Sequence, residues 1–152
     1  MRTEVEKLIN AILDESDCIE DLIDAMREQR EAMRNRDTEA INDLMDETRN
    51  ISFEVQSCEG LRNDLARKLA AAYSCEPKIS SIASKFTDNE EREKFNEAAE
   101  KLKQSVFVLK SEIMILNGLI DQNEKYTSML LSEWRRLNGD SISQTGSADF
   151  RG

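Results

Sequence analysis

Six carboxylates recur at intervals of three or four residues in the first part of the chain: Asp14, Asp17, Asp21, Asp24, Glu28 and Glu31. On a helix this spacing lines them along one face, where they could bind a divalent cation or exchange protons. A single helix, however, cannot wrap its own carboxylates around one ion, and no Asp-rich loop with a glycine turn accompanies them. The six also fall opposite the apolar stripe of the same segment. The pattern therefore predicts a solvated outer face rather than a metal site.

The side chains that most often carry catalysis are missing from this chain. It contains no histidine, which removes the commonest general base and the commonest metal ligand. Its serines therefore lack a histidine base, and the Glu-x-x-His pairs of helical di-iron proteins are absent. No glycine-rich loop follows a strand, so no nucleotide site is predicted. We expect neither an enzyme nor a bound cofactor or metal.

The three cysteines, Cys18, Cys58 and Cys75, lie far apart in the sequence and form no C-x-x-C pair. Their spacing indicates neither a zinc site nor a disulfide framework. We expect buried, reduced thiols.

The composition is that of a protein built from long helices. Of the 152 residues, 39% are hydrophobic and 34% are charged, with one proline and five glycines. The net charge of −10 argues against nucleic acid or an anionic membrane as partner, because both require a basic face. No stretch approaches the roughly 20 apolar residues of a membrane span, and the N-terminal segment lacks a signal-peptide apolar run. We therefore expect a cytoplasmic protein without membrane insertion.

Heptad repeats of apolar residues predict three long helices over about 3–34, 38–74 and 88–138. The first repeat comprises Val5, Ile12, Ile19, Met26 and Met33, with Leu8 and Leu22 on a second seam. The second helix carries seams at Leu44, Ile51, Cys58, Leu65 and Ala72 and at Ile41, Thr48, Val55, Arg62 and Leu69. The third carries Phe95, Leu102, Leu109, Leu116, Asn123, Leu130 and Leu137, and Ala99, Val106, Ile113, Ile120, Thr127 and Trp134. Arg62 interrupts its seam, and we expect its charge to reach outward to solvent.

Capping residues and breakers mark the helix ends. Asp37 is the expected N-cap of the second helix, and Pro77 follows its end. A short helical connector over 78–86 precedes a capping box in which Thr87 caps the third helix and Glu90 reaches back. These signals predict an all-α, elongated antiparallel three-helix bundle or coiled coil. One helical domain over 1–139 and a flexible C-terminal tail over 140–152 are expected.

The third helix is longer than the first two. At about 1.5 Å per residue the three measure roughly 48, 55 and 76 Å, so the third should project roughly 20 Å past the loop joining the others. Six large apolar residues fall on that projection: Tyr126, Met129, Leu130, Leu131, Trp134 and Leu137. An uncovered apolar stripe of this kind favours binding of another protein. Self-association into a homodimer through the C-terminal helix, as in a structural coiled-coil protein, and internal packing under the tail remain as alternatives.

Three long acidic helices, the segments "EGLRNDLARKL" (59–69) and "LNGLIDQNEKYTSMLL" (116–131), and a short glycine-containing tail resemble the FlgN-type flagellar export chaperones. Asn117 and Asn123 carry the most specific part of the resemblance. It implies a cytoplasmic chaperone that binds hook-associated proteins of the hook–filament junction, keeps them unassembled and delivers them to the type III export gate. It also implies that the C-terminal part of the chain, here the six apolar residues, holds the client.

The resemblance further implies a docking residue in the tail. Tails of this family tend to carry a tyrosine a few residues before a glycine, for docking to the export gate. The matching segment here is "ADFRG", with Phe150 and Gly152. Phenylalanine keeps the aromatic ring and lacks the hydroxyl, so docking that depends on a hydroxyl is not expected.

Overall fold

The computed structural model describes residues 2–137, apart from the side chains of residues 2, 123, 125–127, 129–131, 133, 134 and 137. This part of the chain forms four helices, α1 (Arg2–Arg34), α2 (Thr38–Tyr73), α3 (Ile79–Ala83) and α4 (Asn89–Leu137), and contains no strand. The all-α prediction is confirmed. The chain divides into two compact units, Met1–Met114 and Ile115–Gly152. The expectation of one domain over 1–139 with a tail over 140–152 stays a prediction, as does the projection of the last helix.

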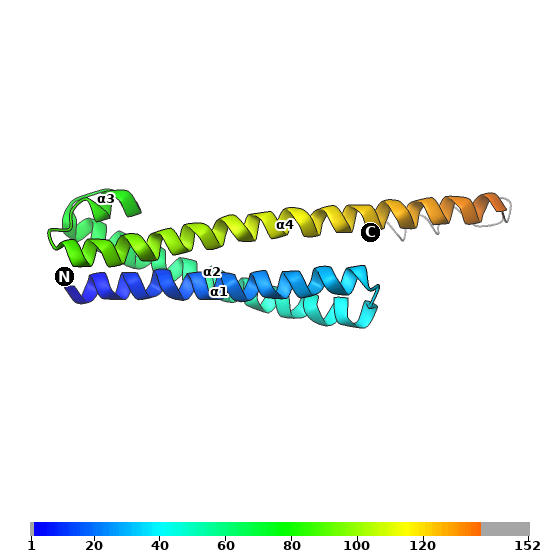
Figure 1. Ribbon diagram of the computed structural model, residues 1–152. Helices are drawn as coiled ribbons and strands as arrows, with labels where there is room; N and C mark the ends of the chain where they lie inside the picture. The colour runs from blue at the N-terminus through cyan, green and yellow to red at the C-terminus, as the bar shows by residue number, and fades with distance from the viewer. Residues whose placement is uncertain (1, 138–152) are drawn as a thin grey trace. The chain divides into compact units, whose positions relative to one another are not determined.

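Helices α1 and α2 form an antiparallel hairpin (Figure 1). The turn between them contains only Asn35, Arg36 and Asp37, and Arg36 adopts the left-handed conformation with φ 54°. Asp37 caps α2, as predicted, because its carboxylate accepts a hydrogen bond from the backbone N–H of Ala40 at 3.2 Å. Because this turn is so short, the two helices lie antiparallel and pack against each other along their apolar stripes.

Polar pairs inside the hairpin fix its register. The guanidinium of Arg62 binds the carboxylate of Glu15, whose side chain is only 5% exposed. The Thr48 hydroxyl donates to the side-chain oxygen of buried Gln29 at 3.4 Å. The prediction that Arg62 points outward is therefore wrong: a buried carboxylate across the hairpin draws the guanidinium inward, because an unpaired buried charge would be costly.

The connector between α2 and α4 closes one end of the core with Ile82, Ala83 and Phe86. Ser74, with φ 54°, ends α2 by donating its N–H to the last-turn carbonyls of Ala70 and Ala71. Phe86 is buried, and its ring makes edge contacts with Tyr73 and Phe95 at centroid distances of 5.9 and 5.1 Å. The aromatic cluster holds α3 and the start of α4 against the end of α2.

The start of α4 differs by one residue from the predicted capping box. The side chain of Asp88, not Thr87, accepts a hydrogen bond from a first-turn amide, the N–H of Glu90, at 3.0 Å. The Asp88 carboxylate reaches this N–H directly, and α4 accordingly begins at Asn89.

Within the first unit, α4 packs on α1 through a face that the heptads located only in part. The seam with Phe95 and Leu102 is buried, as predicted. The predicted companion seam holds only in part: Val106 is partly buried against the core, whereas Ile113 is 38% exposed. The buried positions beside the first seam lie one residue earlier, at Ala98, Ser105 and Glu112. The reason is electrostatic: Glu112 is buried between Arg27 and Arg30 of α1, at 3.0 and 3.1 Å, which rotates its side of α4 inward.

The Glu15–Arg62 pair generates a stability prediction. Replacing Arg62 by methionine leaves a buried carboxylate without its partner, and we expect the free energy of unfolding to fall by about 2–4 kcal/mol. The double variant Glu15→Leu/Arg62→Met should recover most of this loss, since both charges are then gone. Urea unfolding followed by circular dichroism at the helix band measures both effects.

The matched control is Arg67→Met, because Arg67 and its partner Asp64 are 67% and 65% exposed on the same helix. An exposed pair contributes little, so the control should lose less than about 0.5 kcal/mol. If Arg62→Met and Arg67→Met unfold at the same urea concentration, Glu15 and Arg62 do not stabilise the hairpin.

Candidate binding surface on the C-terminal helix

The predicted client-binding residues lie on the backbone of α4, which stays helical to Leu137. The side chains of Tyr126, Met129, Leu130, Leu131, Trp134 and Leu137 lie outside the described residues. At about 100° per residue, positions 126, 129, 130, 134 and 137 fall within an arc of about 140° around the helix, and position 131 lies beyond one edge. The helical backbone thus gives these positions a common face. Phe150 lies outside the described residues altogether.

Polar residues occupy the other side of this segment. Glu124, Ser128, Ser132 and Arg136 follow one another every four residues, and all four side chains are exposed. Helical geometry places them on an arc of about 120° centred opposite the apolar positions. Apart from Glu133, whose position falls within the apolar arc, residues 124–137 therefore have the two-faced pattern of a helix that binds another helix or a groove along one side.

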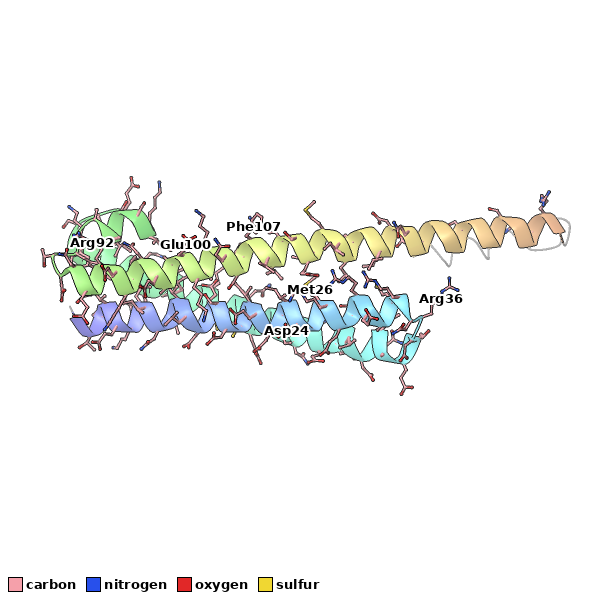
Figure 2. All side chains as sticks on the ribbon, in the orientation of Figure 1. Asp24, Met26, Arg36, Arg92, Glu100 and Phe107 are labelled. Atoms are coloured by element: carbon pink, nitrogen blue, oxygen red, sulfur yellow. The ribbon has the colours of Figure 1, made fainter. Side chains whose placement is uncertain are left out.

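A second apolar surface was missed by the heptad analysis. On the part of α4 in the first unit, Phe107 and Met114 are 69% and 74% exposed, and the side chain of Phe107 points away from α1 (Figure 2). They occupy the same heptad position, one residue after the predicted seam positions Val106 and Ile113. The signal was visible in the sequence as adjacent pairs of large apolar residues, Val106–Phe107 and Ile113–Met114. One member of each pair cannot reach the core.

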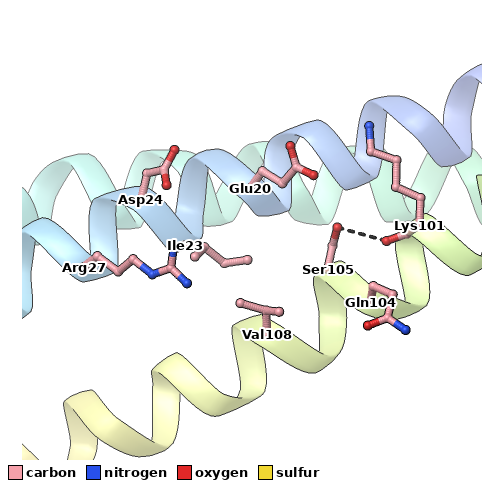
Figure 3. Close-up of a pocket in the computed structure, with 8 residues that line it drawn as sticks. All are labelled: Glu20, Ile23, Asp24, Arg27, Lys101, Gln104, Ser105 and Val108. Atoms are coloured by element: carbon pink, nitrogen blue, oxygen red, sulfur yellow. Dashed lines mark hydrogen bonds between the residues drawn. The ribbon is translucent and has the colours of Figure 1, made fainter.

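A groove of about 350 Å³ runs between α1 and α4 in the first unit (Figure 3). Its lining comprises Glu20, Ile23, Asp24, Arg27, Lys101, Gln104, Ser105 and Val108. The two cations are already paired, Arg27 with Glu112 at 3.0 Å and Lys101 with Asp17 at 3.3 Å. The hydroxyl of Ser105 donates to the backbone carbonyl of Lys101 at 3.0 Å, the usual bond of a helical serine. The groove therefore serves helix packing, and it offers neither an activated nucleophile nor an unpaired cation.

The acidic row on α1 is a solvated face, as predicted. All six carboxylates, Asp14, Asp17, Asp21, Asp24, Glu28 and Glu31, are exposed. Over the described residues, no cluster of three or more cysteine, aspartate or glutamate side chains is arranged to hold a metal ion. Among these same residues, no helix is both long and apolar enough to cross a membrane.

The comparison with protein families decides what kind of chain this is. The family model described as FlgN protein matches residues 1–145, nearly the whole sequence. The chain belongs to the FlgN family. FlgN proteins are flagellar export chaperones rather than enzymes, and as a family they bind flagellar hook-associated proteins. Comparisons with curated proteins and with solved structures give no match.

The FlgN match covers the C-terminal segment of α4 and the first part of the tail, residues 140–145. Residues 126–137, with the amphipathic pattern described above, lie inside the matched range. Phe150 and Gly152, the tail residues resembling a gate-docking motif, lie beyond its end. Of the two asparagines that carried the sequence resemblance, Asn117 has an exposed side chain and that of Asn123 is outside the described residues.

The exposed pair Phe107 and Met114 on α4 leads to a prediction about which apolar side chains of this helix stabilise the fold. Phe107→Ser and Met114→Ser should each change the free energy of unfolding by no more than about 0.5 kcal/mol, because both side chains already face water. Phe95→Ala, at a fully buried position of the same helix, should cost about 3–5 kcal/mol. Thermal and urea unfolding of the three variants measures the difference. A loss above about 1.5 kcal/mol in Phe107→Ser would mean that this ring is covered in the folded protein.

Proposed function

We propose that this chain is a cytoplasmic chaperone of the flagellar type III export pathway that binds hook-associated proteins of the hook–filament junction. It keeps these clients unassembled and delivers them to the export gate. The observation that carries the proposal is the FlgN match over residues 1–145 together with an amphipathic helix at its C-terminal end. Family membership supports the class of client, and the helix supplies a surface of suitable chemistry.

The proposed binding mode is helix against helix. Junction proteins that polymerise through amphipathic helical termini expose an apolar stripe before assembly, and a second amphipathic helix covers such a stripe well. Tyr126, Met129, Leu130, Leu131, Trp134 and Leu137 form the client-facing stripe, with Leu130 and Trp134 as anchors. Large side chains of this kind each contribute about 1.5–3 kcal/mol when fully buried. The polar arc with Ser128 and Ser132 stays in water.

The acidic body has a separate role in this proposal. A net charge of −10 keeps the chaperone and its complex soluble while the client is held. Chaperoning of this kind depends on binding affinity alone, and client release belongs to the export machinery.

The test uses Trp134, the single tryptophan of the chain, as an intrinsic probe. Terminal fragments of hook-associated proteins from the same genome should shift its fluorescence on binding, because the indole leaves water. Trp134→Ala and Leu130→Ala, measured by calorimetry, should each weaken binding about 30-fold or more. Ser132→Ala, on the exposed polar arc of the same helix, should change the dissociation constant less than about twofold.

Truncation after Lys125 provides the second arm. The shortened chain should keep its helical circular dichroism and no longer retain client fragments. If it binds them as tightly as the full chain, residues 126–137 are not the client site.

Light scattering over a range of concentrations tests self-association. A stable dimer that is lost in Trp134→Ala/Leu137→Ala would assign this stripe to a homodimer instead.

Docking to the export gate is proposed for Phe150. The prediction is that Phe150→Ala reduces export of hook-associated proteins in cells while client affinity measured in vitro stays unchanged. Phe150→Tyr should retain export, since docking here uses the ring and not a hydroxyl. A loss of client affinity in Phe150→Ala would place this residue with the client site rather than the gate.

A further inference from the structure

Two of the three cysteines meet across the α1–α2 hairpin. The sulfur atoms of Cys18 and Cys58 lie 3.4 Å apart although 40 residues separate them in the sequence. Both side chains are half-buried rather than fully buried as expected, so a small reagent can approach them. The third thiol, Cys75, follows Cys58 by 17 residues and lies just beyond the end of α2, about 25 Å farther along the helix axis. It is too distant to replace either partner.

The register of the hairpin makes this contact more than a chance side-chain orientation. Glu15 with Arg62, Cys18 with Cys58 and Gln29 with Thr48 are pairs whose residue numbers add up to 77, 76 and 77. When two antiparallel helices pack in one register, the numbers of residues that face each other have a constant sum, because one number rises as the other falls. The Glu15–Arg62 ion pair lies within about one turn of each thiol and the Gln29–Thr48 pair lies beyond them, so both flanks of the thiol pair are fixed.

We propose that Cys18 and Cys58 form a reversible intramolecular disulfide that links α1 to α2 and does not involve Cys75. The oxidant is a small organic disulfide. In the first step the thiolate of one cysteine attacks a sulfur of the reagent, forms a mixed disulfide and expels one reagent thiolate. In the second, the other cysteine attacks the protein sulfur of that mixed disulfide and expels the second reagent thiolate. The protein loses two electrons and two protons, and the reagent leaves as two thiols.

Geometry favours the second step and the surroundings slow the first. The sulfur atoms need to approach by about 1.4 Å to reach the bond length of about 2.05 Å, a small movement for half-buried side chains. Burial, then the neighbouring Cys58 thiol and the carboxylates of Glu54 and Asp21, raise the pKa of Cys18 to about 12. Its thiolate is therefore scarce at neutral pH, and oxidation should accelerate as the pH rises. A pair of this kind responds to prolonged oxidising conditions and is distinct from a permanent structural disulfide.

The experiment treats the reduced full-length chain with hydroxyethyl disulfide, an uncharged reagent suited to an acidic site, and follows the intact mass. The Cys75→Ser chain should lose the mass of two hydrogen atoms, and peptide mapping should recover Cys18 joined to Cys58. The wild-type chain should form the same link, with any hydroxyethylthio group carried by Cys75. Cys18→Ser and Cys58→Ser should stop at the mixed disulfide, each retaining one hydroxyethylthio group on the remaining partner. The melting temperature of the oxidised wild-type chain should exceed that of the reduced chain by about 5 °C or more.

Repeating the reaction in concentrated urea tests whether the folded hairpin is responsible. Unfolding separates the thiols, so the yield of the Cys18–Cys58 link relative to mixed disulfides should drop severalfold. An equal yield in urea, a link involving Cys75, covalent dimers as the main product, or accumulation of mixed disulfides at Cys18 or Cys58 of the wild-type chain would each overturn the proposal. The proposal is independent of client binding, and the Ser variants should behave as stated whether or not the chain binds hook-associated proteins.

Discussion

The register of the α1–α2 hairpin depends on alternating apolar and polar layers along one seam. The α1 side of the seam reads Leu8, Glu15, Leu22 and Gln29, and the same register places Leu69, Arg62, Val55 and Thr48 opposite them. A slip of one heptad would place the buried carboxylate against Val55 or Leu69 and the guanidinium against Leu8 or Leu22. Leaving one buried charge unpaired costs several kcal/mol, comparable with the stability of a whole domain. An all-leucine seam would stabilise the helix pair at least as strongly, but it would select one register far less strictly.

The same principle positions the third long helix within the first unit. Glu112 uses both carboxylate oxygens, one for Arg27 and one for Arg30, and so links α4 to the C-terminal third of α1. This contact determines which side of α4 faces inward, and consequently which apolar side chains are left outside. Phe107 and Met114 are exposed because the helix is rotated to bring a carboxylate into the core. Charge placement, as much as hydrophobicity, therefore shapes the surface that this chaperone offers.

Heptad spacing and capping chemistry predicted the helices and their class because both are local properties of the sequence. The predictions were wrong where the orientation of a side chain depends on a partner that is distant in the sequence. Arg62 turns inward only because Glu15 is buried opposite it, and Ile113 turns outward only because Glu112 finds two arginines. The proximity of Cys18 and Cys58 has the same origin, since spacing along the chain says nothing about cross-hairpin distance. For the binding surface, the amphipathic pattern of residues 124–137 was readable from the sequence, whereas the exposed pair Phe107 and Met114 required knowledge of how α4 is rotated.

The contacts that α1 makes with α2 and with α4 differ greatly in sequence separation, and this has a consequence for synthesis on the ribosome. Helices α1 and α2 are joined by three residues, so their contacts close with little loss of chain entropy. Arg27 and Glu112, in contrast, are separated by 85 positions, and α4 emerges last. At typical translation rates of about 5–20 residues per second, the nascent hairpin waits several seconds with one apolar side open to water. During its own synthesis, a protein of the FlgN chaperone family thus passes through a state similar to the one proposed for its clients. In both, the apolar surface of an amphipathic helix is exposed until another helix packs against it.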